Sequence, residues 1–131
     1  GGQLFVLTDA LTFSAAITTA AFIKEAGGDR VALIGEPPGD RLSFFSEGGR
    51  ACLPNLKVCL YYQMARHDYG HACTDWRECF WLNWLYPVRV RTLQPDIVVP
   101  LKFDDWNRGR DAAYDVAREL AGKLRPRLQR R

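Results

Sequence analysis

The sequence predicts an α/β fold in which a strand, a helix and a second strand form the core. Two short apolar runs, Leu4–Leu7 and Val31–Ile34, have the character of strands buried on both faces, as in a parallel sheet covered by helices. The stretch between them, Ser14–Ala26, is rich in alanine and carries apolar residues at helical spacing. This order predicts a βαβ unit with a right-handed crossover.

The predicted helix has recognisable ends. Ser14 follows a polar turn and stands where the helix begins, and Gly27-Gly28 supply the left-handed backbone that commonly ends a helix. The second strand stops at Gly35-Glu36-Pro37-Pro38-Gly39, because glycine and proline interrupt regular structure.

A meander of mostly antiparallel strands is expected next. Leu42–Phe45, Arg50–Leu53 and Lys57–Tyr62 have the character of short strands, and Pro54-Asn55 is a turn dipeptide between the last two. Cys52 and Cys59 fall on opposite arms of that hairpin. They could therefore pair across it.

The segment Gln63–Pro87 is the least regular part of the chain. It holds both histidines, three of the four tryptophans and two of the four cysteines. This density without periodicity predicts an ordered aromatic and cysteine-rich excursion, pinned by Cys73–Cys79, rather than a core element. His67, His71, Cys73 and Cys79 could alternatively form a zinc set, although the spacing H-x3-H-x-C-x5-C matches no common structural zinc pattern.

The chain is expected to close with two strands and a helix. Val88–Arg91 and Ile97–Val99 have strand character, and Gly109-Arg110-Asp111 opens a helix that runs to about Leu124. Pro126 is expected to mark its end. Residues 125–131 then form a basic tail.

Composition sets limits on function. The 131 residues match one domain with a hydrophobic core, and 47% apolar with 25% charged residues is typical of a globular protein. Four arginines in the tail account for the net charge of +3, since without them 14 basic residues face 15 acidic ones. The folded part therefore lacks the basic surplus of a nucleic-acid-binding protein. No apolar run reaches the ~20 residues that span a bilayer.

The N-terminus and the cysteines bear on where the protein is located. The chain begins with Gly1-Gly2 directly before a strand, from which we expect the C-terminal piece of a longer protein whose signal peptide lies elsewhere. An even number of cysteines in close pairs is compatible with disulfides and so with a periplasmic or secreted protein, although four buried thiols would look the same.

Ser14 is the residue on which the functional question depends. A serine at a strand-to-helix turn can cap the helix or act as a nucleophile. The first N–H groups of the helix, those of Ala15 and Ala16, are expected to be unpaired and to favour a developing oxyanion. Local sequence alone favours the cap, because serine is among the best N-cap residues.

A set of motifs in a fixed order changes that preference. They are Leu4–Leu7, Thr12-Phe13-Ser14-Ala15-Ala16, Val31–Ile34 with Gly35-Glu36-Pro37, Gln94-Pro95-Asp96-Ile97-Val98-Val99, and Gly109-Arg110-Asp111. Together they resemble the second half of the catalytic domain of the C-terminal processing (tail-specific) serine peptidase family, over nearly all of residues 3–124. The resemblance implies a fold of the Clp protease/crotonase type. It also implies that Ser14 is the nucleophile and that the Ala15 N–H is an oxyanion donor.

The chain departs from the family's Ser–Lys members. Their pattern G-E-x-x-x-G-K, laid on Gly35-Glu36, puts Arg41 or Asp40 at the lysine position, and arginine does not release its proton near neutral pH. Ile17 and Thr18 stand where the family usually has a glutamate. The chain is thus more similar to the tricorn-like branch, which lacks that lysine and takes a histidine from the first half of the catalytic region.

Other bases within the chain are weaker candidates. His67 and His71 are the only histidines and are expected to be structural. Lys24 lies about three helical turns from Ser14, too far for proton transfer.

We therefore expect a serine-type endopeptidase whose general base lies outside this chain, and an isolated chain that is inactive. The alternative is a non-catalytic peptide-binding or scaffolding relative on the same fold. The expected partners are a peptide or protein substrate and, for the protein itself, a homo-oligomer. No cofactor, metal or nucleic acid is expected.

Overall fold

The computed structural model describes the backbone of residues 2–128 and the side chains of residues 2–124. The chain divides into two compact units, residues 1–39 with 93–131 and residues 40–92, and each is described by itself. Within the described residues the fold is mixed α/β, with one parallel sheet and one antiparallel sheet.

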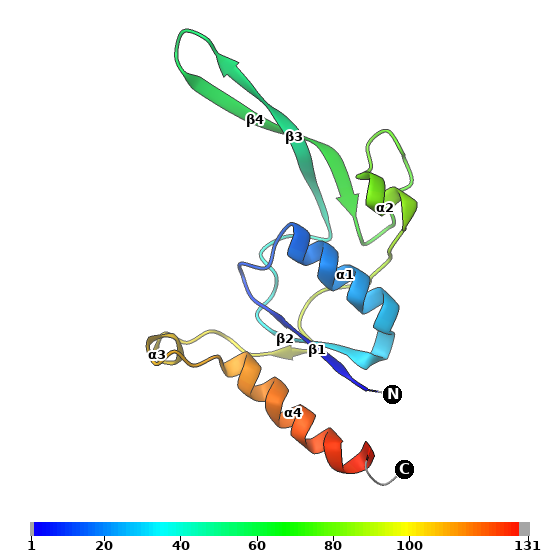
Figure 1. The fold of residues 1–131 in the computed structure, drawn as a ribbon, viewed down its shortest axis with the longest axis vertical. Helices are drawn as coiled ribbons and strands as arrows, with labels where there is room; N and C mark the ends of the chain where they lie inside the picture. The colour runs from blue at the N-terminus through cyan, green and yellow to red at the C-terminus, as the bar shows by residue number, and fades with distance from the viewer. Residues whose placement is uncertain (1, 129–131) are drawn as a thin grey trace. The chain divides into compact units, whose positions relative to one another are not determined.

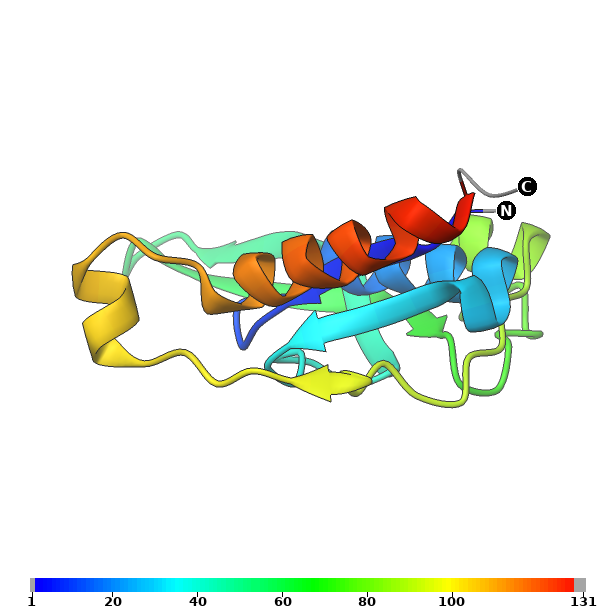
Figure 2. The ribbon, with the colours of Figure 1, turned by 90° about the horizontal axis from the view of Figure 1, so that it is seen from below.

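The first unit is built on the predicted βαβ motif. Strand β1 (Leu4–Thr8) pairs in parallel with β2 (Val31–Gly35), and helix α1 (Ala15–Gly27) connects them. Strand β5 (Ile97–Val98) joins the other edge of β2, so the strand order is β1-β2-β5. Helices α1 and α4 (Ala112–Leu128) lie on opposite faces of this small sheet (Figures 1 and 2).

The predicted burial holds for β2 but not for β1. β2 is the central strand, and Val31, Leu33 and Ile34 are buried with Ile17, Ala20 and Ala21 of α1. Leu4 and Leu7 of β1 are exposed, because β1 is an edge strand with a neighbour on one side only. The expectation that β1 is buried on both faces is therefore wrong for the chain as described.

The ends of the two long helices differ in how well they were predicted. Gly28 follows α1 with a φ of 53°, and its N–H donates to the Lys24 carbonyl, as expected for a glycine at a helix end. α4 does not stop at Pro126, because a proline in the last turn removes a single backbone donor without breaking the preceding turns. The predicted basic tail thus begins inside α4, and residues 129–131 lie outside the described residues.

The second unit contains one long hairpin instead of the expected meander. β3 (Ser43–Leu53) pairs antiparallel with β4 (Val58–Asp68), so the two predicted strands on either side of Glu47-Gly48-Gly49 are a single strand. The glycines weaken strand propensity, but cross-strand pairing on both sides keeps the strand continuous. Cys52 and Cys59 stand opposite each other and form a disulfide.

The segment that follows the hairpin is the core of this unit, which corrects the expectation of an excursion outside the core. Tyr69, Cys73 and Asn83 are fully or almost fully buried, and Asn83 on the short helix α2 (Trp81–Leu85) accepts a hydrogen bond from the Asp68 N–H at 2.7 Å. A Cys73–Cys79 disulfide closes the loop as predicted. Val88–Arg91 forms no strand: Val88 and Val90 are buried, and the Val90 N–H donates to the Tyr69 carbonyl at 2.8 Å without a ladder of further bonds that would make a strand.

Candidate active site

Ser14 occupies a backbone conformation that non-glycine residues rarely adopt. Its φ is 53° and its ψ is −120°, and this geometry costs about 1–3 kcal/mol unless the surrounding structure maintains it. Sharp strand-to-helix turns with a strained serine are one way in which hydrolases expose a nucleophilic Oγ. In the described part of the chain the Ser14 side chain makes no capping hydrogen bond, so Ser14 does not act as an N-cap through its hydroxyl.

The N–H groups that follow Ser14 are partly available. The Ala16 N–H donates to the Phe13 carbonyl at 3.1 Å, which corrects the expectation that it is unpaired. Among the described residues, the Ala15 N–H has no acceptor, and Ala15 itself is exposed. One oxyanion donor therefore stands beside Ser14, at the positive end of α1.

A hydrogen-bonded turn holds the chain before Ser14. The Asp9 carboxylate accepts hydrogen bonds from the Leu11 N–H and the Thr12 hydroxyl, each at 3.0 Å. The Asp9 N–H donates to the Thr12 hydroxyl, and the Thr12 N–H donates to the Asp9 carbonyl. These reciprocal contacts define the path into α1 and supply the support that a strained residue needs.

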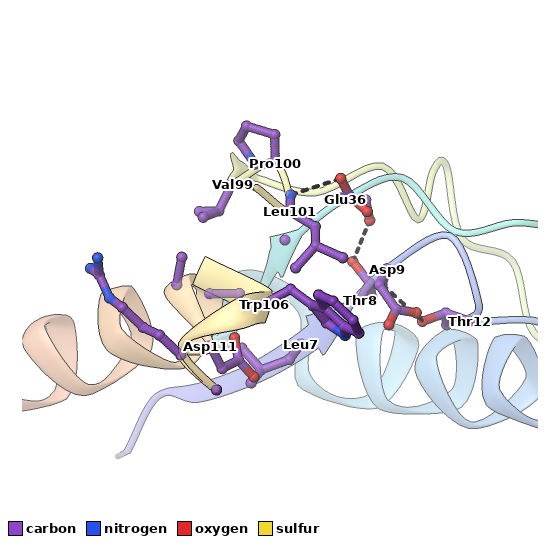
Figure 3. Close-up of a pocket in the computed structure, with 15 residues that line it drawn as sticks. Leu7, Thr8, Asp9, Thr12, Glu36, Val99, Pro100, Leu101, Trp106 and Asp111 are labelled. Atoms are coloured by element: carbon purple, nitrogen blue, oxygen red, sulfur yellow. Dashed lines mark hydrogen bonds between the residues drawn. The ribbon is translucent and has the colours of Figure 1, made fainter. Parts of the chain in front are cut away.

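A pocket of about 390 Å³ lies at the carboxyl ends of the parallel strands, where open α/β sheets usually bind ligands (Figure 3). It is lined by Leu7, Thr8, Asp9, Thr12, Gly35, Glu36, Val99, Pro100, Leu101, Trp106, Gly109, Arg110, Asp111, Ala112 and Ala113. Sequence reasoning did not identify this pocket, although each of the five motifs quoted above contributes at least one residue to its walls. Thr12 belongs to the lining and Ser14 does not.

Gly35 and Glu36 form the floor of this pocket. Gly35 has a φ of 131°, and a Cβ there would overlap the Thr8 carbonyl oxygen. The Glu36 N–H donates to the Thr8 carbonyl, and the Thr8 hydroxyl donates to the Glu36 carbonyl, both at 2.9 Å. One Glu36 carboxylate oxygen accepts the Leu101 N–H at 2.8 Å. The glycine–glutamate pair therefore joins the ends of β1 and β2 to the segment after β5.

The Gly109-Arg110-Asp111 motif shapes the opposite wall. Asp111 caps α4, since its carboxylate accepts the Tyr114 N–H at 2.9 Å. Arg110 bonds Asp115 at 2.8 Å and Asp105 at 3.2 Å, and these carboxylates raise the pKa of Arg110 while Arg110 lowers the pKa of Asp115. The motif therefore fixes where α4 starts.

Asp96, from the Gln94–Val99 motif, links three elements of the first unit. Its carboxylate accepts the Leu33 N–H at 2.8 Å and the Lys24 ammonium at 3.0 Å, and its own N–H donates to the Leu33 carbonyl. The Leu33 hydrogen bond is the largest cause of a lowered Asp96 pKa, and Lys24 adds to it. Lys24 also donates to the Val31 carbonyl, so it has a structural role far along α1 from Ser14.

The Asp96 contacts predict a pH-dependent loss of stability. Asp96→Asn should lower the free energy of unfolding at pH 7 by about 1 kcal/mol, a value reduced for the partial exposure of the carboxylate. Because the folded-state pKa is lowered, the ionised group stabilises the fold above its unfolded pKa, and this contribution is lost as pH falls through the folded pKa. Urea unfolding from pH 7 to pH 3 should therefore show the variant and the parent converging. Glu25→Gln, which removes an exposed carboxylate on α1, should have nearly the same free energy of unfolding as the parent at every pH.

The remaining candidates from the sequence lie in the second unit. His67 is 3% exposed, stacks between Phe44 and Phe80, and bonds the Tyr69 hydroxyl at 2.9 Å and Glu47 at 2.6 Å. This is the structural role expected of it. His71 is exposed and lies 3.5 Å from Asp68.

The cysteines of the zinc alternative are engaged with each other. Cys73 and Cys79 are joined in a disulfide and so offer no thiolates to a zinc ion. Arg41, at the lysine position, is exposed, and its backbone N–H donates a hydrogen bond to the Asp40 carboxylate.

Comparison with known proteins identifies no relative: no family model, curated protein or solved structure matches this chain.

Proposed function

We propose that the chain is the nucleophile-bearing part of a serine-type endopeptidase of the C-terminal processing kind. Ser14 attacks a peptide carbonyl, and the Ala15 N–H donates to the oxyanion that forms. The observation that carries the proposal is the strained, uncapped Ser14 at the start of α1, with an unpaired N–H beside it. A helix-capping serine needs neither the strain nor the free donor.

The proposal assigns the general base to a part of the protein outside this chain. Within the described residues no base is hydrogen-bonded to Ser14, Lys24 is engaged with Asp96 and Val31, and His67 is buried among aromatic rings. Leu4, Leu7, Leu11 and Phe13 are exposed along β1 and the turn that precedes Ser14. Such a surface suits the docking of another part of a catalytic domain.

Further parts of the proposal concern fold and location. The parallel β1-β2-β5 sheet with helices on both faces supports a core of the Clp protease/crotonase type. The two disulfides support a periplasmic or secreted location. Among the described residues, no helix is both long and apolar enough to cross a bilayer.

Labelling with a fluorophosphonate, which reacts with activated serines, tests the nucleophile. The intact protein should take up one equivalent, and Ser14→Ala should abolish uptake. Thr19→Ala, which removes an exposed hydroxyl on the same helix, should label as the parent does. Equal labelling of the Ser14→Ala variant would refute the assignment.

The pocket supports a second candidate function, that of a peptide-binding relative without catalysis. Its lining includes Asp9, Glu36 and Trp106 but not Ser14, so it could hold a peptide without a reaction at the serine. This candidate predicts that the intact protein binds peptides in calorimetry and that fluorophosphonate labels no residue.

A further inference from the structure

The hairpin of the second unit has two faces of different character. β4 contains no positive-φ residue, so its side chains alternate between faces from Val58 to Asp68. The register then assigns each residue of β3 to the face of its partner. The Cys52–Cys59 disulfide and the stacked Phe44–His67 pair lie on one face, which agrees with this assignment.

The other face is apolar and exposed. Between Gly49 and Leu53 on β3, and between Val58 and Tyr62 on β4, the register assigns no charged side chain to it. Glu47, which precedes this stretch on β3, has a positive φ of 38° and bonds His67 on the face that carries the disulfide. We call the exposed apolar face the apolar hairpin face, and its large members are Phe45, Leu53, Val58, Leu60, Tyr62 and Met64. Arg66 closes the face at its base, where its guanidinium lies near Asp68 and Glu78. The disulfide face, by contrast, presents Arg50, Tyr61 and Gln63 to solvent.

This exposure is larger than scattered surface residues would give. Each of the six large side chains is about half exposed or more, so together they leave on the order of 500 Å² of apolar surface in contact with water. A contiguous patch of that size on a monomer usually marks an interaction site. An isolated two-stranded ribbon is also only marginally stable in water, so a covering layer would stabilise it.

The chemistry of the face selects a protein over a lipid. Within the described residues no further strand pairs with either edge of the ribbon, although the Arg66 backbone bonds Glu78 and Phe80 at its base. Hydrocarbon cannot satisfy the N–H and C=O groups along such edges. A second layer of strands packs on such a face and leaves the edges in water. Between Gly49 and Leu53 and between Val58 and Tyr62 the face carries no charge, so this part of it meets a copy of itself without like-charge repulsion.

We propose that the apolar hairpin face is a homodimer interface in which two hairpins pack face to face about a two-fold axis. Each residue near the axis then meets its own kind, as in an isologous contact. Two copies bury on the order of 1,000 Å², which is in the range of weak, reversible interfaces, so we expect a monomer–dimer equilibrium rather than a permanent dimer. This inference does not depend on the peptidase proposal.

Sedimentation equilibrium of the full 131-residue chain tests the dimer. The parent should show a monomer–dimer equilibrium, and Leu60→Arg should raise Kd by at least about 10-fold, because a charge then enters the centre of the interface. Tyr61→Arg is the matched control: it is the next residue, it is 77% exposed against 63% for Leu60, and it lies on the other face. Its Kd should stay within about twofold of the parent. Val58→Arg should repeat the Leu60→Arg effect, and circular dichroism should show all variants folded.

Several results would overturn the proposal. A parent that stays monomeric up to about 0.5 mM would do so, and so would a dimer that Leu60→Arg and Val58→Arg leave intact. Co-sedimentation with phosphatidylcholine vesicles measures whether the face binds lipid instead. Binding of the parent that is lost in Leu60→Arg, with no dimer in solution, would assign the face to a membrane instead.

Discussion

Replacing Ser14 with alanine in the intact protein should lower kcat/KM for peptide hydrolysis by at least about 10³-fold, since loss of a nucleophile removes the covalent pathway. The same change should leave the free energy of unfolding within about 0.5 kcal/mol of the parent, because the Ser14 hydroxyl caps nothing in the described structure. Kinetics on a fluorogenic peptide and urea unfolding measure the two quantities.

Ser14→Gly distinguishes the effect of backbone strain on stability from the effect of the hydroxyl on activity. Glycine adopts a φ of 53° and a ψ of −120° with little strain, so this variant should be equally inactive but more stable by about 1 kcal/mol. A capping serine predicts the reverse pattern, in which Ser14→Ala retains activity and costs about 1 kcal/mol of stability. That pattern would remove the basis for the proposed function.

Gly35→Ala should lower the free energy of unfolding by more than about 3 kcal/mol, the largest change in stability that we expect from a single methyl group here. Alanine at Gly35 would have to keep a φ of 131°, and its Cβ would overlap the Thr8 carbonyl oxygen. The backbone of Thr8 cannot move without breaking its hydrogen bond to the Glu36 N–H, which joins β1 to β2 at the pocket.

Gly122→Ala provides the control for this prediction. Gly122 lies within α4, and a Cβ there would meet no atom within 4 Å. The same substitution should therefore raise stability, by up to about 1 kcal/mol, through helix propensity. Denaturant unfolding measures both variants, and a stable Gly35→Ala protein would mean that the strand ends are not joined as described.

The sequence was sufficient for the first unit because its signals are local. Apolar runs bounded by glycine and proline marked β1, β2 and β5, and the alanine-rich stretch marked α1 within one residue at each end. The sequence could not show that β1 is an edge strand, since edge position depends on which strand pairs where.

The second unit was harder to predict because its pairing is not local. Glu47-Gly48-Gly49 suggested a break, but β4 pairs with β3 on both sides of it. The core role of Tyr69 and Asn83 depends on aromatic stacking and on a buried side-chain hydrogen bond, which leave no periodic signal.

In the candidate site, too, the features with a local sequence signal could be predicted and those that depend on tertiary contacts could not. The position of Ser14 at a strand-to-helix turn was predicted, and its strain was not, because φ cannot be inferred from a serine in a turn. Asp9 and Thr12 could have been found, since an aspartate and a threonine three residues apart before a helix often form such a turn. The structural role of Asp96 could not be predicted, because it depends on the pairing that sets Asp96, just before β5, beside Leu33 of β2.

Trapping the acyl-enzyme tests the central claim most directly. The intact protein is mixed with an activated ester of a short peptide, quenched with acid within the first turnover, digested with trypsin and analysed by mass spectrometry. A covalent nucleophile accumulates the acyl group when deacylation is slow. The account predicts the acyl mass on Ser14, in the tryptic peptide that ends at Lys24. Turnover with the acyl group on another residue, or with no acyl-enzyme and an unmodified Ser14, would contradict it.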